Sequence, residues 1–221
     1  MKKILALALT LILGLSLTAC SGNNSGGQAG NGSNPNAAAQ EKTSPPDTKA
    51  EIGSQTQLNT GNKKILIAYF SRSGNTREIA NQIHANVGGD MFEIKAVDSY
   101  PADYNATTEQ AKRELETNYR PKLTATVQNM ASYDVIFLGY PNWWGTMPMA
   151  VFTFLEGHNF SGKTIIPFST HEGSRFGRSV SDLRQLCPQA TLLDGFAIRG
   201  SSAKSAQNDV ATWLHQIGMI K

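Results

Sequence analysis

The sequence has 221 residues, with 20 lysines and arginines against 17 aspartates and glutamates, so its formal net charge at pH 7 is +3. This near balance is not typical of nucleic-acid-binding domains, and we predict no nucleic-acid partner. The chain has 2 cysteines. Because we expect Cys20 to be modified, Cys187 has no partner for an intramolecular disulfide bond, and the fold has to be stabilised by a hydrophobic core.

The first nineteen residues have the pattern of an export signal. Lys2 and Lys3 precede an apolar run over residues 4–17, which is too short to span a bilayer. The run ends in Leu-Thr-Ala directly before Cys20, which resembles the lipobox of bacterial lipoproteins. The resemblance implies a signal peptide over residues 1–19, a lipid on Cys20 and an extracytoplasmic protein anchored to a bacterial membrane. An ordinary secretory signal or an uncleaved anchor are the alternatives.

A low-complexity segment follows the signal. Residues 20–62 are rich in Gly, Ser, Asn, Gln, Pro and Ala and contain few large apolar side chains. Such a composition cannot bury enough apolar surface to offset the entropy of ordering. We therefore predict a disordered linker over residues 20–62 and one folded domain over residues 63–221.

Apolar runs alternate with amphipathic segments along the predicted domain. Five runs have the character of buried strands, at residues 64–70, 91–95, 134–140, 163–169 and 191–198. Between them lie helical stripes, such as that of Ile79, Ile83 and Val87, and the polar stretch 101–131 contains one predicted helix over residues 103–118. Strands alternating with helices predict an α/β fold with a doubly wound, five-stranded parallel sheet.

Ligands bind such sheets at the carboxyl ends of the strands, so the loops there carry the candidate site. The loop after the first strand consists of Ser71, Arg72, Ser73, Gly74, Asn75 and Thr76. Hydroxyl groups and a glycine at a helix start favour a bound phosphate. The loop lacks the lysine of a Walker A motif and the spacing of the dinucleotide fingerprint. The alternative is a plain helix cap.

Two further loops follow the third and fourth strands. The first contains Pro141, Asn142, Trp143, Trp144 and Gly145. Adjacent tryptophans in a loop cannot readily both enter the core, so we expect one to be partly exposed; the alternative is that both pack over the next helix.

The loop after the fourth strand contains Thr170, His171, Gly173, Arg175 and Phe176. His171 lacks the neighbours of a catalytic triad and the spacing of a metal site, so we predict no catalytic side chain and no metal.

Taken together, the three loops resemble the FMN-binding loops of the flavodoxin-like family, and in particular of short domains with a Tyr-Pro-x-Trp-Trp-Gly sequence, here residues 140–145. The resemblance implies strand order 2-1-3-4-5 and non-covalent FMN, with its phosphate on residues 71–76. It also implies that Trp143 and Phe176 face the two sides of the ring. The near-neutral charge and the export signal differ from the acidic cytoplasmic carriers of the family.

These features predict electron transfer at the extracytoplasmic membrane surface, with a redox partner protein, a quinone or another small molecule as the acceptor. In that function FMN supplies the chemistry and the protein supplies binding and electrostatics. An NAD(P)H-dependent quinone or flavin reductase is one alternative. A non-redox ligand-binding module is another, because a fold does not fix a function.

Overall fold

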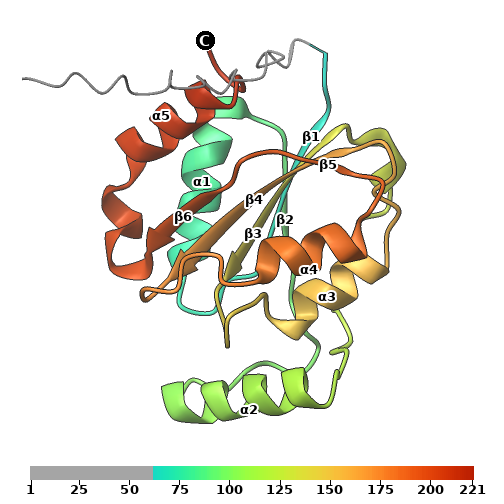
Figure 1. Cartoon of the computed structure of the whole chain (residues 1–221), viewed down its shortest axis with the longest axis vertical. Helices are drawn as coiled ribbons and strands as arrows, with labels where there is room; N and C mark the ends of the chain where they lie inside the picture. Colours follow the sequence, from blue (N-terminus) through green and yellow to red (C-terminus); the bar gives the residue numbers. More distant parts are fainter. Residues whose placement is uncertain (1–61) are drawn as a thin grey trace, which may run out of the picture. The chain divides into compact units, whose positions relative to one another are not determined.

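The computed structural model describes residues 62–221, which form a parallel sheet between two layers of helices (Figure 1). The predicted signal peptide, Cys20 and the predicted linker up to residue 61 lie outside the described residues. Within the described range, no helix is long and apolar enough to cross a membrane.

The sheet has the predicted order of strands. Its path runs β2-β1-β3-β4-β5, with β6 also pairing with β4, and every pair is parallel. The strands are β1 (Ile65–Tyr69), β2 (Asp90–Glu93), β3 (Val135–Pro141), β4 (Thr164–His171), β5 (Thr191–Leu192) and β6 (Phe196–Arg199). The doubly wound α/β fold and the order 2-1-3-4-5 are thus confirmed.

Helices cover both faces of the sheet. The α-helices are α1 (Asn75–Val87), α2 (Tyr104–Glu116), α3 (Met149–Glu156), α4 (Ser179–Leu186) and α5 (Gln207–Gln216), and the short 3-10 helices are η1 (Met130–Ser132) and η2 (Gly200–Ser205). Figure 1 shows α1 and α5 on one face and α3 and α4 on the other. Helix α2 lies on neither face but beyond the carboxyl ends of the strands.

Side chains of the central strands pack alternately into two separate hydrophobic cores. Leu66 and Ala68 of β1 belong to the core under α3 and α4, whereas Ile65 and Ile67 belong to the core under α1 and α5. This period of two is expected when both faces of a strand are covered. The central strands are therefore buried on both sides, and their carboxyl ends are rigid supports for the loops that follow.

The predicted fifth strand, residues 191–198, is one run in the sequence but two strands in the structure. Ile165 pairs with Leu192, but Phe168 pairs with Phe196, so one extra residue lies on the outer strand between the two pairs. Pro167 of β4 stands at this point and has no N–H group to donate to a neighbouring strand. The expectation of one continuous edge strand was wrong, and this interruption at Pro167 is the reason.

Candidate functional site

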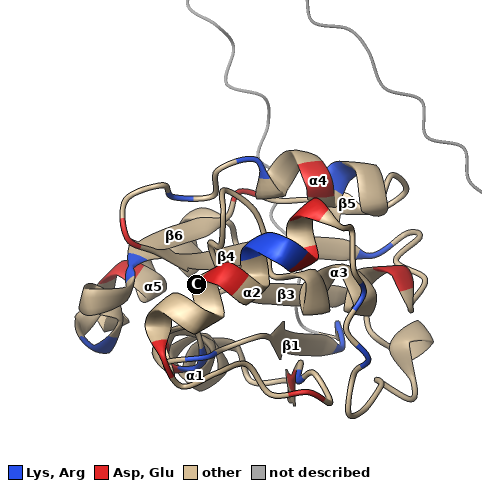
Figure 2. Cartoon of the chain, turned by 90° about the horizontal axis from the view of Figure 1, so that it is seen from below, with Lys and Arg blue, Asp and Glu red and all other residues tan. Residues whose placement is uncertain are grey.

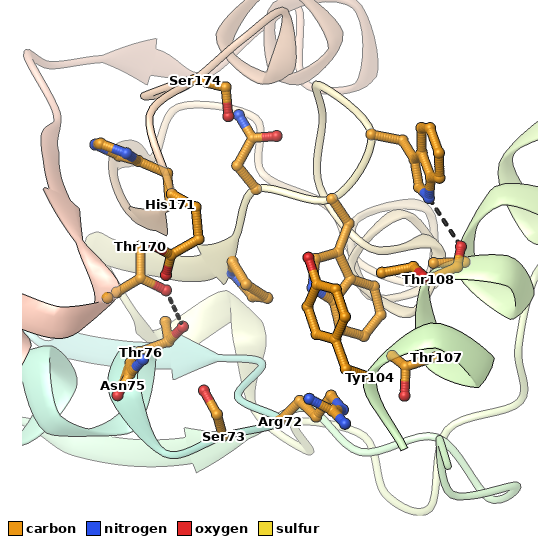
Figure 3. Close-up of a pocket in the computed structure, with 17 residues that line it drawn as sticks. Arg72, Ser73, Asn75, Thr76, Tyr104, Thr107, Thr108, Thr170, His171 and Ser174 are labelled. Carbon is orange, nitrogen blue, oxygen red and sulfur yellow. Dashed lines mark hydrogen bonds between the residues drawn. The ribbon is translucent and has the colours of Figure 1, made fainter. Parts of the chain in front are cut away.

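A cavity of about 350 Å³ opens at the carboxyl ends of β1, β3 and β4 (Figure 3). All three predicted loops contribute to its wall. The predicted site residues that line it are Arg72, Ser73, Asn75, Thr76, Pro141, Asn142, Trp143, Trp144, Thr170 and His171. The volume lies in the range of small-molecule sites in proteins.

Other predicted residues lie in the same loops but outside the cavity wall. These are Ser71, Gly74, Gly145, Gly173, Arg175 and Phe176. The Phe176 ring packs against the core under α3 and α4, where a Cβ atom on Gly195 would lie 2.7 Å from its Cζ. The structure therefore does not bring Phe176 to the cavity opposite Trp143.

The amino-terminal end of α1 opens without a side-chain cap. Gly74 occupies the N-cap position with φ +91°, and no side chain of the described residues caps the helix there. Ser71 Oγ instead accepts a hydrogen bond from the Arg77 N–H group at 3.2 Å. Ser71 thus satisfies one N–H group of the first turn from outside the N-cap position, and the N-cap position itself has no side-chain acceptor. The helix dipole and the first N–H groups of α1 favour an anion at this end.

Thr76 and Thr170 join the first and third loops inside the cavity. The two hydroxyl oxygens are 2.8 Å apart, and Thr76 is 1% exposed and Thr170 5% exposed (Figure 3). A hydroxyl can donate one hydrogen bond and accept two. If Thr170 donates to Thr76, the Thr76 proton is free for a ligand.

The tryptophan loop is a tight turn with an unusual backbone. Trp143 and Thr146 exchange two backbone hydrogen bonds at 2.9 and 3.1 Å, and between them Trp144 has φ +52° and Gly145 φ +82°. Positive φ at both central positions is typical of type I′ turns, which glycine, asparagine and aspartate favour. A bulky residue at such a position costs about 1 to 3 kcal/mol. The surrounding contacts therefore hold Trp144 against a local preference.

The two tryptophans have different surroundings. Trp143 is half-buried and meets the rings of Phe70 and Tyr100 edge-on, with centroids 5.3 and 5.1 Å away. Trp144 is 53% exposed. The prediction that one of the pair is partly exposed is confirmed, and the alternative that both are packed over the next helix is excluded.

Hydrogen bonds join the loop after β3 to the loop after β4. Asn142 Nδ2 donates to the Arg175 carbonyl oxygen and the Asn142 N–H group to the Thr170 carbonyl oxygen, each at 2.8 Å. The Arg178 N–H group donates to the Gly145 carbonyl oxygen at 2.8 Å. Both loops thus form a single wall of the cavity.

His171 lies in this wall as a hydrogen-bond acceptor. Its Nδ1 atom accepts a hydrogen bond from the Gly173 N–H group at 2.9 Å. Burial, and then the charges of Arg199 and Arg175, lower the pKa of His171 below its ordinary 6.5. The ring is neutral at pH 7, with its proton on Nε2 when Nδ1 accepts. Nothing in the described residues pairs it with a nucleophile, and no group of His, Cys, Asp and Glu there could hold a metal ion.

The sequence did not place α2 at the cavity. This helix supplies Tyr104, Thr107, Thr108 and Ala111 to the wall, and Figure 3 shows the labelled residues among them on the side opposite Thr76 and Thr170. The helix itself matches the predicted range, and Asp103 caps it by accepting from the Ala106 N–H group. Its capping signal was readable, but no local pattern indicates where a helix outside the sheet layers packs.

Charges of both signs surround the cavity. Arg72 lines it and donates to the Ala102 carbonyl oxygen at 2.5 Å, while Glu172 also lines it. Arg77 lies over the start of α1, with Nη2 3.3 Å from the position of a Cβ atom on Gly74. Figure 2 shows basic and acidic residues interspersed on α2 and on α4. The region that favours an anion is therefore confined to the start of α1, near Arg72 and Arg77.

The fold and the cavity define a doubly wound α/β protein that binds its ligand at the carboxyl ends of the strands. The family model described as Flavodoxin matches residues 64–217, and the chain belongs to this family. No curated protein matches the chain.

The chain is also similar to solved structures of other proteins. A protein of Bacteroides eggerthii described as a flavoprotein is 34% identical, with 71% of this chain and 98% of that chain covered and a TM-score of 0.63. One of Bacteroides uniformis, described in the same way, is 30% identical, with 69% and 98% covered and a TM-score of 0.62. A flavoprotein of Lactobacillus acidophilus solved in complex with FMN is 23% identical, with 65% of this chain and 97% of that chain covered and a TM-score of 0.53. This similarity is one of fold.

Proposed function

We propose that this chain is a redox flavoprotein that binds FMN non-covalently in the cavity and passes electrons at the extracytoplasmic surface of a bacterial membrane. One observation carries the proposal: the cavity joins an uncapped helix start with hydroxyl groups at one end to a tryptophan wall at the other. Family membership and the relatives described as flavoproteins support it. Bound FMN would supply one- or two-electron chemistry, for which the protein provides binding and electrostatics.

The donor set fits the phosphate group of FMN. Ser73 and Thr76 offer hydroxyl groups, and Asn75 offers an amide. The N-cap position of α1 has no side-chain acceptor, so first-turn N–H groups other than that of Arg77, which Ser71 binds, are left for a ligand. Hydrogen bonds to a charged group are among the stronger ones in proteins. A phosphate bound here needs no lysine, which agrees with the absence of a Walker A motif from the loop.

The opposite part of the wall fits a flat aromatic ring. Pro141, Trp143 and Ala111 provide apolar surface, and Phe70 and Tyr100 fix the plane of the Trp143 indole by edge-on contacts. An aromatic ring held in this way can stack on one face of a flavin without losing much side-chain freedom. Because Phe176 packs against the core and lies outside the cavity wall, we propose that Tyr104 of α2 is the second aromatic residue that faces the flavin.

The test is to purify the full chain and look for flavin. We expect a yellow protein that releases FMN on denaturation, and flavin-free protein that binds FMN more tightly than riboflavin, which lacks the phosphate group. A colourless protein with no affinity for FMN would exclude the proposal. Rapid reduction of the bound flavin by NADH or NADPH would instead support the reductase alternative.

The location is a separate part of the proposal. The Leu-Thr-Ala sequence before Cys20 supports lipid attachment at that cysteine, and the anchor would hold the domain near membrane quinones or a redox partner protein. We expect metabolic labelling with a fatty-acid analogue to mark the wild-type protein and not the Cys20→Ala variant. Equal labelling of both proteins, or labelling of neither, would contradict the assignment of Cys20.

A further inference from the structure

We propose that Trp144 is a latch that fastens the amino-terminal half of α2 over the cavity and so sets the rate at which FMN enters and leaves. The inference rests on the proposed function for its ligand. Trp144 is then a positioning residue, whereas Trp143 forms the stacking wall.

The contacts of Trp144 point to α2. Its indole N–H group donates to the carbonyl oxygen of Thr108 at 2.8 Å, the bond drawn as the dashed line that ends at Thr108 in Figure 3. The ammonium group of Lys112, one turn further along the helix, lies 5.5 Å from the centroid of a Trp144 ring, which is within the range of a cation–π interaction. A large aromatic side chain that is 53% exposed is thus fixed by polar contacts to one helix.

The backbone of Trp144 supports the same role. Its φ of +52° is a conformation that a bulky side chain adopts only when its surroundings enforce it. The backbone hydrogen bonds between Trp143 and Thr146 fix the conformation of the turn, and the hydrogen bond to Thr108 fixes the Trp144 side chain. The turn therefore projects the indole away from the core and toward α2.

The two halves of α2 are attached differently. The carboxyl-terminal half is anchored: Leu115 packs against the core under α3 and α4, and the buried Glu114 accepts a hydrogen bond from the Tyr100 hydroxyl at 2.7 Å. The amino-terminal half carries the cavity residues Tyr104 and Thr107.

The amino-terminal half has no comparable apolar anchor among the described residues. Thr108 bonds to Trp144, and Arg72 donates to the Ala102 and Pro101 carbonyl oxygens just before the helix. Figure 1 shows α2 outside the layered part of the domain. A helix secured by its carboxyl-terminal end and by a few polar bonds elsewhere can open locally at low cost.

The experiment compares two Trp→Phe variants of the full chain. Trp144→Phe keeps the ring but removes the N–H donor, and its exposed position spares the fold. Trp213→Phe is a control for the loss of an indole donor outside the cavity wall, because the Trp213 indole N–H group also donates to a backbone carbonyl oxygen, that of Asp194 at 3.0 Å. Two readouts are taken: hydrogen exchange of the α2 amides in flavin-free protein, and FMN dissociation into excess competing flavin-binding protein. Since Trp213 is buried, urea unfolding of both variants is measured as well.

We expect Trp144→Phe to speed exchange in the first two turns of α2 and to speed FMN dissociation by about fivefold, the factor for one hydrogen bond of ordinary net strength. Trp213→Phe should change neither. Unchanged exchange in Trp144→Phe, faster exchange in both variants, or faster exchange without faster FMN release would each overturn the latch. If wild-type protein binds no FMN, the proposed function fails, and the exchange data still decide whether Trp144 holds α2.

Discussion

The paired hydroxyl groups of Thr76 and Thr170 offer a test that separates ligand binding from folding. Thr76→Val keeps the shape of the side chain and removes its hydroxyl, leaving the buried Thr170 hydroxyl without this partner at 2.8 Å. A buried polar group that loses its partner costs about 1 to 3 kcal/mol. We therefore expect a lower free energy of unfolding, and a melting temperature lower by about 2 to 4 °C for each kcal/mol.

The affinity for FMN should fall as well. A hydrogen bond to a charged phosphate is worth about 1.5 to 3 kcal/mol, so Thr76→Val should weaken binding by roughly ten- to a hundredfold. The double variant Thr76→Val, Thr170→Val separates the two effects. Replacing both partners by apolar groups of similar shape is often nearly neutral, so stability should largely return while FMN binding stays weak.

The measurements are urea unfolding of flavin-free protein and titration with FMN. Thr153→Val serves as a control, because its hydroxyl bonds to the Met149 carbonyl oxygen within α3, away from the cavity wall. Wild-type FMN affinity in Thr76→Val would refute the placement of the phosphate. Stability losses that simply add in the double variant would refute the coupling of the two hydroxyl groups.

Three further predictions follow from other contacts. FMN should quench tryptophan fluorescence, and Trp143→Ala should relieve much of this quenching and weaken binding by about tenfold; relief in Trp144→Ala instead would identify the other tryptophan as the stacking residue. Since the pKa of His171 is lowered from 6.5, its contribution to stability is present above about pH 6.5 and is lost as pH falls through the folded-state pKa. Urea midpoints should therefore fall less steeply on acidification in His171→Gln, and identical slopes would contradict this. Gly139→Ala places a Cβ atom 2.1 Å from the Phe168 ring, so thermal unfolding should show a loss of about 3 kcal/mol.

The sequence predicted the features that local patterns determine. Buried runs such as residues 135–139 have no polar side chain to place in water, so they had to be interior strands, and the loops at their carboxyl ends followed from topology. Trp143 and Thr76 could therefore be placed at the cavity from their positions after β3 and β1.

The features that sequence reasoning did not place depend on tertiary packing. Phe176 lies in a loop that is close enough to the cavity to face it, but its ring fills the space beside Gly195, which has no side chain. Tyr104 is exposed and belongs to a polar helix, so nothing in its neighbourhood in the sequence indicates a cavity wall. Pro167 was part of an apolar run, and its effect on the edge strand depends on which strand is its neighbour.

The bonds between the loops after β3 and β4 constrain how this protein can be re-engineered. A Cβ atom on Gly177 would lie 2.2 Å from the Gly145 carbonyl oxygen, so a side chain at position 177 would displace the loop after β3. Helix α2 stands outside the sheet layers (Figure 1), and its amino-terminal half meets these loops through the backbone carbonyl oxygen of Thr108, which any residue can supply. Grafting experiments that seek a new acceptor should exchange the amino-terminal part of α2, residues 104–111, and leave Tyr100 and the paired loops as a fixed half of the binding site.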